Sequence, residues 1–336
     1  MKKTGAIFIL LLGLVTVAGA QNFFPILGGQ RVGTSSFTFL KIGASARAVG
    51  MGEAVVAMNQ DAASVYYNPA TLAQLHNTEL TTSRVNWPAD IAYDFISVTH
   101  HLASRHYLGF SAGILHMAPM EETTEYRPHG TGNYFTYQDR FLGLSYAVKL
   151  TDRFSFGLTM KDVQEDLAGT RMRVMLLDMG TFYWTGYKSL RFSAALSHFG
   201  PQAAPEGTYA KRVLDADTGN ETILETAFQE FSPPTLFQVG AAMEIIERPL
   251  TALTLSVQLN HPVDNAEYVL TGMEYQLFHI LYLRSGVKLG KEEEGMSAGL
   301  GLSIPLGSWR LNADYSWTNM SHLSDPVRFS LGLGMK

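Results

Sequence analysis

Apolar and polar residues alternate along most of the chain after residue 78. In the segment 153–161, apolar residues occupy every second position, and serine, glycine, threonine and basic residues fall between them. The segments 307–318 and 327–335 repeat this alternation. A period of two over such lengths predicts long β-strands with one face in apolar surroundings. Strands in soluble sheets average only ~5–6 residues, so these segments fit tilted membrane-crossing strands better.

The alternating segments predict a closed barrel. We expect strands at residues 79–86, 91–101, 106–118, 134–149, 153–163, 174–186, 189–199, 233–245, 250–260, 266–278, 279–290, 295–304, 307–318 and 327–335. These are fourteen segments, and a closed bacterial barrel needs an even number. The predicted fold class is therefore an all-β membrane protein, a ~14-stranded antiparallel transmembrane β-barrel with a short N-terminal helical, hatch-like segment.

The connections between these segments test the barrel prediction independently. Long connections follow odd-numbered strands, at residues 120–134, 163–171 and 200–234. Short connections follow even-numbered strands, such as residues 150–152 and 305–307. Long extracellular loops and short periplasmic turns are typical of outer-membrane barrels. A secreted soluble β-sandwich, the alternative reading, has no reason to sort its loops in this way.

Aromatic and basic residues refine the prediction. Aromatic residues near strand ends predict membrane-interface girdles; they are Tyr107, Tyr183, Trp184, Tyr282 and Trp309. Basic residues on the polar faces are expected to line and brace the barrel interior; they are Arg153, Lys161, Arg191, Lys288, Arg310 and Arg328.

Composition narrows the function classes. Charged residues make up 16% of the chain, well below the ~25% of an ordinary soluble domain. The chain has no cysteine, which excludes disulfides and thiolate metal sites. The net charge of −5 gives no basic footprint for nucleic acid, so we expect no nucleic-acid partner.

The first residues predict export. Lys2 and Lys3 precede an apolar stretch, and Ala18-Gly19-Ala20 forms a small-x-small cleavage site. This pattern predicts a signal peptide over residues 1–20, the alternative being an N-terminal membrane anchor. The predicted organisation is a signal peptide at 1–20, a plug-like segment at 21–78 and an outer-membrane barrel at 79–336.

Residues 21–78 lack the alternation of the barrel. They contain a glycine-rich stretch around Arg47, and then Asp61 and Asn68, each followed by a short apolar segment. Asp and Asn favour helix N-caps, and Pro69 favours the first helical position. We therefore predict a glycine-rich turn followed by two short helices. A phosphate cradle at Arg47 is the alternative, but the chain lacks the P-loop pattern there.

The segment 39–73 resembles the PorV/PorQ family, within the FadL-like outer-membrane barrels. The family-motif residues are Gly43, Arg47, Gly50, Met51, Gly52, Asp61, Ala62, Asn68, Pro69 and Ala70. Position 71 is threonine, where many of these proteins carry glycine. These motif residues are expected to be structural parts of a hatch inside the barrel, and Asn68 is expected to clasp the N-terminal segment.

The resemblance implies two functions that share one fold. The PorV/PorQ branch implies a role in type IX protein secretion or surface attachment, with the translocon or exported proteins as partners beside outer-membrane lipid. The long connection at 199–233 would be the docking candidate. The FadL-like relationship implies transport of hydrophobic small molecules such as long-chain fatty acids. Fold alone does not decide between them.

Catalytic chemistry has little support in the sequence. His100, His101 and His106 surround one predicted turn, and the acidic run 292–294 lies in a predicted loop. Solvated turns and loops explain both better than metal sites do. No serine, histidine and aspartate constellation stands out on strand ends. We expect no enzyme activity, no catalytic residue, no metal and no cofactor.

Overall fold

The computed structural model describes residues 32–58, 61–75, 77–214 and 221–335. The predicted signal peptide lies outside the described residues. Within the described residues, no helix is long and apolar enough to cross a membrane.

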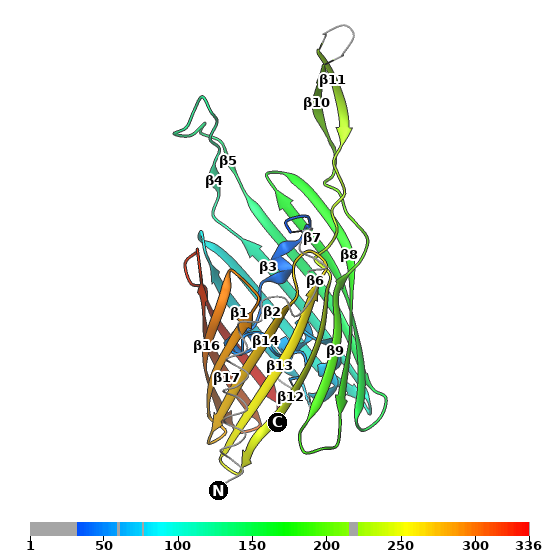
Figure 1. Ribbon diagram of the computed structural model, residues 1–336, viewed down its shortest axis with the longest axis vertical. Helices are drawn as coiled ribbons and strands as arrows, with labels where there is room; N and C mark the ends of the chain where they lie inside the picture. Colours follow the sequence, from blue (N-terminus) through cyan, green and yellow to red (C-terminus); the bar gives the residue numbers. More distant parts are fainter. Residues whose placement is uncertain (1–31, 59–60, 76, 215–220, 336) are drawn as a thin grey trace.

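Fourteen strands form a closed antiparallel barrel, as predicted (Figure 1). They are β1 (Glu79–Trp87), β2 (Ile91–Ala103), β3 (His106–His116), β6 (Tyr137–Lys149), β7 (Phe154–Leu167), β8 (Thr170–Trp184), β9 (Arg191–Phe199), β12 (Leu236–Arg248), β13 (Thr251–Pro262), β14 (Tyr268–Leu277), β15 (Leu281–Leu289), β16 (Glu294–Leu306), β17 (Trp309–Met320) and β18 (Val327–Met335). The barrel closes where β1 pairs with β18, from Glu79 opposite Gly334 to Asn86 opposite Val327.

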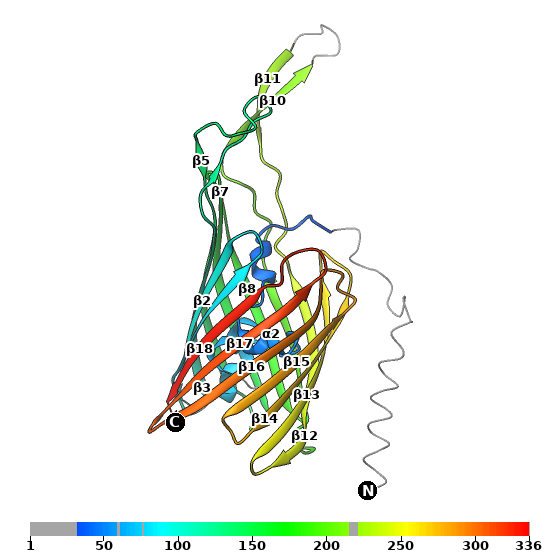
Figure 2. The same cartoon turned by 90° about the vertical axis from the view of Figure 1, so that its left-hand side faces the viewer.

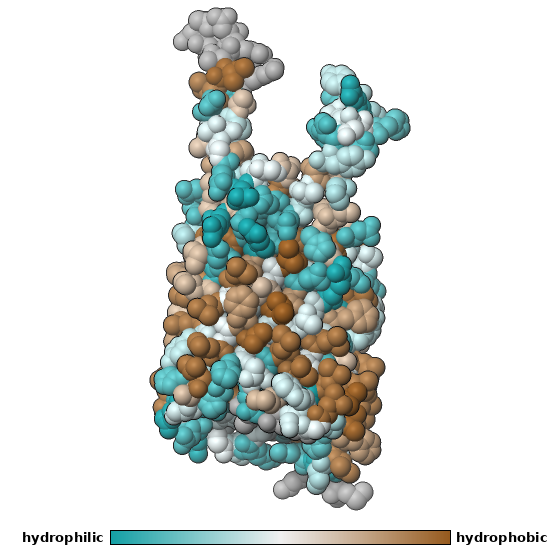
Figure 3. All heavy atoms as spheres, turned by 180° about the vertical axis from the view of Figure 1, so that it is seen from behind, coloured by the Kyte–Doolittle hydropathy of each residue, from teal (hydrophilic) through white to brown (hydrophobic). Residues whose placement is uncertain are grey.

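The two faces of each strand meet different surroundings. In β7, Ser155, Thr159 and Lys161 point into the barrel and are almost fully buried. Met160, between them, faces outward with 54% of its surface exposed. On the face seen in Figure 3, apolar side chains gather over the middle and lower parts of the barrel wall, and hydrophilic side chains are concentrated above them. This outward apolar and inward polar pattern is that of a membrane-spanning barrel.

Two hairpins project from one end of the barrel (Figures 1 and 2). One contains β4 (Met120–Glu121) and β5 (Tyr134–Phe135), and the other contains β10 (Thr208–Leu214) and β11 (Glu221–Ala227). The C-terminus and the short turns lie at the opposite end. Loop length therefore assigns the hairpin end to the extracellular side and the C-terminal end to the periplasm.

One predicted loop is wrong. Residues 163–171 were expected to form a long connection, but β7 and β8 continue through them and leave only Ala168 and Gly169 between the strands. Both of these residues have positive φ, as a tight turn requires. Cross-strand ion pairs, Asp166 with Arg171 and Asp162 with Arg173, stabilise the extension.

The predicted aromatic girdle is only partly present. Tyr183 and Trp309 face outward near the periplasmic end, as a girdle residue should. Tyr107 is buried inside the barrel instead, and Trp184 donates its indole N–H to an interior glutamine. Tyr282 lines an interior cavity. Interior packing uses aromatic residues as readily as a membrane interface does.

The short helices that precede β1 in the sequence lie inside the barrel (Figures 1 and 2). They are η2 (Thr38–Lys41), α2 (Ala46–Gly50), η3 (Ala62–Tyr66) and η4 (Pro69–Gln74). The two predicted helix starts are confirmed, because Asp61 caps η3 and Asn68 caps η4. The predicted glycine-rich turn is wrong in part: Ser45 accepts a hydrogen bond from Ala48 N and begins the helical turn α2.

The outward face of β6 gives a test of the membrane-spanning assignment. Leu144, near the middle of β6, is 59% exposed in a position that faces lipid. Replacing it by arginine (Leu144→Arg) should destabilise the folded barrel by about 2–4 kcal/mol, because the charge enters the bilayer midplane. Denaturant unfolding in lipid vesicles measures this. Tyr126→Arg is the control, because Tyr126 is 92% exposed on the extracellular hairpin; equal effects would contradict the membrane assignment.

Candidate functional site

The barrel interior is occupied by the chain that precedes β1. We call residues 32–75 the lumenal segment; all of it except residues 59 and 60 is described. Its helices contact opposite sides of the wall, with α2 against β15 to β18 and η4 against β3 and β6 to β8. Most of its apolar side chains are buried, including Phe37, Leu40, Met51 and Leu72. The candidate site is this segment and the wall residues that hold it.

Asn68 fastens the lumenal segment to β8. Its side chain is fully buried, and its Nδ2 donates to the carbonyl oxygens of Val56 (2.8 Å) and Thr181 (3.1 Å). Its Oδ1 accepts from Ala70 N (3.0 Å) and so caps η4. A Cβ on Gly180 of β8 would overlap this Oδ1, so only glycine allows the close approach.

A second contact of this kind seats Met51 and Gly52. Gly272 of β14 and Gly286 of β15 lie opposite each other in the wall, and the backbone of Met51 and Gly52 rests on them. A Cβ on either wall glycine would overlap that backbone. Gly52 also has φ of 64°, a left-handed conformation that favours glycine. Two motif positions therefore serve close backbone packing.

Arg47 links the lumenal segment to the wall through a chain of charges. Its guanidinium makes two hydrogen bonds to Glu274, Nε to Oε2 at 3.0 Å and Nη2 to Oε1 at 2.9 Å. Arg284 bonds the same carboxylate at 2.6 Å and continues to Asp314 at 2.6 Å. Two cations and two anions thus neutralise one another away from bulk water, as buried charges require.

The two titratable motif residues differ in electrostatics. For Arg47, burial opposes the charged form, but the Glu274 carboxylate beside it raises the pKa above its ordinary value. For Asp61, burial raises the pKa of the carboxyl above its ordinary range, and the Arg47 guanidinium opposes this shift. Asp61 also accepts from Ala63 N (2.9 Å), so its first role is to cap η3.

The remaining motif residues are packing positions. Gly43 and Gly50 lie in crowded places, where a Cβ on Gly43 would overlap Glu53 and one on Gly50 would lie 3.0 Å from Gly299 Cα. The others are buried in η3 and η4; they are Ala62, Pro69 and Ala70. Thr71, where the resemblance suggested glycine, donates to Asn68 O (2.6 Å) and bonds Ser64 Oγ (3.0 Å). The hydroxyl therefore ties η3 to η4.

Four of the six predicted interior cations bind the lumenal segment or the inner wall. Arg328 donates to Gly43 O (3.1 Å), and Arg191 donates to Ala57 O (2.8 Å) and pairs with a wall glutamate. Lys288 pairs with Glu53 of the segment and with wall Glu294 (2.5 Å). Lys161 pairs with Asp178 of the wall at 2.6 Å.

The other two predicted cations differ. Arg153 lies in a periplasmic turn and is exposed, so its assignment to the interior is wrong. Arg310 lines interior cavities but makes no ion pair with any residue that the structure describes. It therefore contributes charge to the cavity without bracing the lumenal segment.

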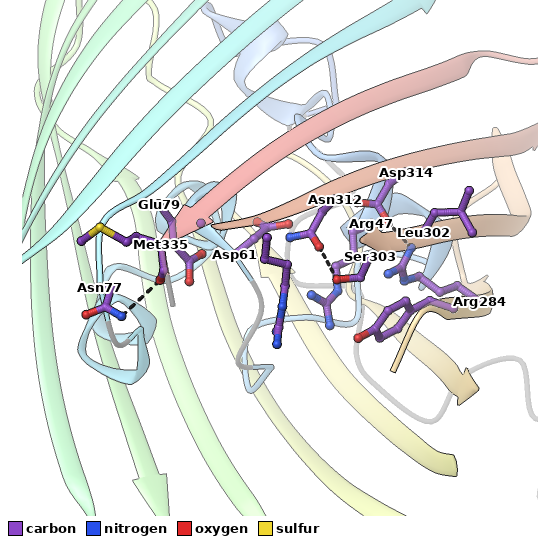
Figure 4. A pocket seen from close by; sticks show the side chains of 13 residues that line it. Arg47, Asp61, Asn77, Glu79, Arg284, Leu302, Ser303, Asn312, Asp314 and Met335 are labelled. Atoms are coloured by element: carbon purple, nitrogen blue, oxygen red, sulfur yellow. Dashed lines mark hydrogen bonds and ion pairs between the residues drawn. The ribbon is translucent and has the colours of Figure 1, made fainter. Parts of the chain in front are cut away.

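Cavities lie on both sides of the lumenal segment. A cavity of 90 Å³ faces the extracellular side, between the segment and the loops after β9 and β13; Lys41, Tyr66 and Asp264 are among its lining residues. Cavities of 230 and 370 Å³ lie on the periplasmic side, with Arg47 and Arg310 in the lining of both. Figure 4 shows the 230 Å³ cavity, into which charged side chains from β1, β15 and β17 project. Charged and polar residues are the majority of the lining residues in both periplasmic cavities.

The histidines singled out in the sequence serve local contacts. His100 bonds Thr78 Oγ1 (2.7 Å), His101 stacks on Tyr107, and His106 bonds the Tyr146 hydroxyl (2.6 Å). Among residues 32–335, outside the undescribed gaps, no group of three histidine or acidic residues has the arrangement of a metal site.

Comparison with known proteins now adds to this geometry. The model of the family "Type IX secretion system protein PorV" matches residues 27–182. The structure is similar to the toluene transporter TodX of Pseudomonas putida, with a TM-score of 0.60, 12% identity, and coverage of 88% of this chain and 98% of that one. The chain is an outer-membrane β-barrel whose residues 27–182 match the model of the PorV family.

Two other solved structures are similar to this barrel. The CymD monoaromatic hydrocarbon channel has a TM-score of 0.56 and 13% identity, over 87% of this chain and 96% of that one. A Pseudomonas aeruginosa FadL homologue has a TM-score of 0.53 and 10% identity, over 86% and 97%. At such low identities, the structural similarity shows a shared fold and nothing more. No curated protein matches the sequence.

Sequence reasoning missed the acidic residues that bind the basic residues inside the barrel. Glu274 and Asp314 were not singled out, although both lie on strands whose alternation gives an inward polar face. An acidic residue on such a face signals a nearby cation. The identity of that cation, Arg47, has no local signal because the two residues are 227 positions apart.

The clasp at Asn68 gives one test. Asn68→Ala removes the cap and leaves the Val56 and Thr181 carbonyls unsatisfied, each such loss costing roughly 1–3 kcal/mol. We expect a lower yield of folded barrel in the outer membrane, measured as the heat-modifiable fraction on gels. Asn77→Ala is the matched control, because Asn77 makes an exposed bond to Met335 O. Normal folding of Asn68→Ala with a selective loss of transport would instead make Asn68 a working part of a hatch.

The charge chain gives another test. Glu274→Gln leaves Arg47 and Arg284 without their shared anion, a change that costs about 3–5 kcal/mol for a buried pair. We expect the lumenal segment to loosen and single-channel conductance in planar bilayers to rise. Glu79→Gln serves as the control, since Glu79 lines the same cavity and makes no ion pair with the described residues. Equal conductance in both variants would show that Glu274 does not hold the segment.

Proposed function

We propose that this protein is a non-enzymatic docking barrel of type IX protein secretion or surface attachment, which binds exported proteins or the translocon through its extracellular hairpins. The family model that matches residues 27–182 supports the secretion role. The observation that carries the docking role is the pair of hairpins that project beyond the barrel rim (Figures 1 and 2).

The hairpins expose apolar side chains to water. Ile223 of β11 is 64% exposed, and Leu224 beside it is also exposed. On the other hairpin, Tyr126 and Tyr134 are exposed. A two-stranded hairpin has no core of its own, and large apolar side chains exposed to water favour a protein partner. The hairpins therefore have the composition of a docking surface.

The filled interior supports docking over conduction. The lumenal segment is held by ion pairs to β14 and β15, by the hydrogen bond of Asn68 to β8, and by backbone packed on wall glycines. We infer that this segment acts as a plug. A plug fastened at so many points suits a protein that presents a surface, because movement of cargo through the barrel would require these bonds to break.

Transport of hydrophobic small molecules is the second candidate. The similar structures include proteins described as a toluene transporter and a monoaromatic hydrocarbon channel. An apolar cluster inside the extracellular half of this barrel, with Phe95, Phe141 and Val174 among its members, is consistent with an apolar ligand. In the present structure Phe37 and Phe39 of the lumenal segment fill that cluster.

Substitutions on the long hairpin distinguish the two functions. Ile223→Asp combined with Leu224→Asp should reduce capture of partner proteins by about tenfold, which corresponds to ~1.4 kcal/mol of binding. Cross-linking in cells followed by mass spectrometry measures capture, and the surface proteome reports secretion. Leu323→Asp is the control, because Leu323 is an exposed leucine on a different extracellular loop. An unchanged surface proteome with lost uptake of labelled fatty acid in a deletion strain would favour transport.

A further inference from the structure

The long extracellular hairpin has a defined base. Ala203 and Phe231 pair across it, with Ala203 N donating to Phe231 O (3.0 Å) and Phe231 N donating to Ala203 O (2.8 Å). This exchange of two hydrogen bonds is that of an antiparallel ladder. The base therefore joins the two legs of the hairpin that contains β10 and β11.

The lumenal segment adds a third strand to this base. Ser36 N donates to Ser232 O (3.1 Å), and Ser35 forms a parallel bridge with Ser232. Figure 2 shows the start of the segment crossing the extracellular rim before it descends into the barrel. The hairpin base and the outer end of the lumenal segment are thus joined by a backbone hydrogen bond.

The outer end of the segment combines a partly exposed ion pair with buried apolar side chains. Asp264 pairs with Lys41 and accepts from Ser35, and the Lys41 side chain is 40% exposed to solvent. Phe37 N donates to the Glu165 carboxylate at 2.9 Å, and the Tyr66 hydroxyl donates to Leu40 O at 2.7 Å. Solvent screens the ion pair and reduces its worth, so withdrawal of this end is opposed mainly by its buried contacts, which a displaced hairpin base must overcome.

The backbone of Phe37, at the outer end of the segment, is strained. Its φ of 56° and ψ of 36° are left-handed, a conformation that a bulky residue rarely adopts. The side chain is buried and belongs to the apolar cluster, which holds the backbone in this conformation. Release of the outer end would relieve this strain, so the left-handed conformation of Phe37 favours the withdrawal of this end.

We propose that the hairpin of β10 and β11 controls the position of the outer end of the lumenal segment. A protein that binds the hairpin and displaces its base withdraws residues 35–41 from the extracellular mouth, while residues 42–75 stay seated on the wall. The identity of the ligand as a protein rests on the proposed docking function; the mechanical link itself rests on the contacts of Ser36 and Ser232.

Withdrawal would change the extracellular cavity. Leu40 and Lys41 form part of the lining of the 90 Å³ cavity, beside Asp264. Their removal opens this space to the outside and exposes the apolar cluster beneath Phe37. Because coupling between two sites is reciprocal, a molecule that enters this space would in turn alter the affinity of the hairpin for its partner.

Amide hydrogen exchange of the purified barrel in lipid nanodiscs tests the link without any partner. Ala203→Pro removes the Ala203 N–H and disrupts the hairpin base. We expect exchange at least about tenfold faster at Ser36, Leu40 and Ile42, whose amides donate to Ser232, Phe37 and Phe39. The deeper amide of Val49, which donates to Ser45 O, should keep its rate.

Thr131→Pro is the matched control. Thr131 N donates to Glu122 O (2.8 Å) in the other extracellular hairpin, so one backbone hydrogen bond is lost in each variant. Exchange in residues 36–42 should stay unchanged. The proposal is overturned if Ala203→Pro speeds exchange at the Phe231 amide but leaves the exchange rates of Leu40 and Ile42 equal to those in the control.

A disulfide gives a second measurement that does not depend on the folding of a proline variant. The chain has no cysteine, so Ser35→Cys with Ser232→Cys forms a unique pair. Oxidation should slow exchange at Leu40 and Ile42 relative to the reduced protein, and equal rates would overturn the proposal. Because neither measurement uses a secretion partner, failure of the docking function would leave these results unaffected, and the reverse also holds.

Discussion

A charged side chain inside a membrane barrel needs an opposite charge, and here the chain's own N-terminal segment supplies part of the set. Arg47 meets Glu274, and Glu53 meets Lys288. Without the segment, Glu274 would retain Arg284 and Lys288 would retain Glu294, but each group would lose part of its neutralisation. The polar wall and the lumenal segment therefore depend on each other, and neither is a complete structure alone.

The barrel could be predicted from sequence because its signal is local and repeated. Alternation over each strand reports the two environments, lipid and lumen, at every second residue. Where the lumen becomes apolar the signal weakens: in β8, Val174 and Leu176 face the lumenal segment, whereas Asp178 on the same face pairs with Lys161. The alternation is interrupted at Asp178 because the environment of the inner face changes along the strand.

The candidate site was only partly predictable for a different physical reason. Helix caps at Asp61 and Asn68 are local chemistry, and both appear where the residue types predict them. The partners of those residues are distant in the chain, as Asn68 with Thr181 shows. The wall glycines could not be predicted either. In sequence Gly180 resembles any other strand glycine, and only the structure shows that Asn68 packs against it. Long-range pairing leaves no periodic trace in a single sequence.

The seam between β1 and β18 has a consequence for assembly. Through α2, the lumenal segment contacts β15 to β18, which are the last strands of the barrel in sequence. Through η4, it contacts β6 to β8. It also precedes β1, so it is made before any strand of the wall. A barrel whose seam closed around an empty interior would then have to thread this segment past its own charges. If the segment is already in place when the seam closes, filling and closure become a single event. The first part of the chain then acts as a template on which the last strands pair.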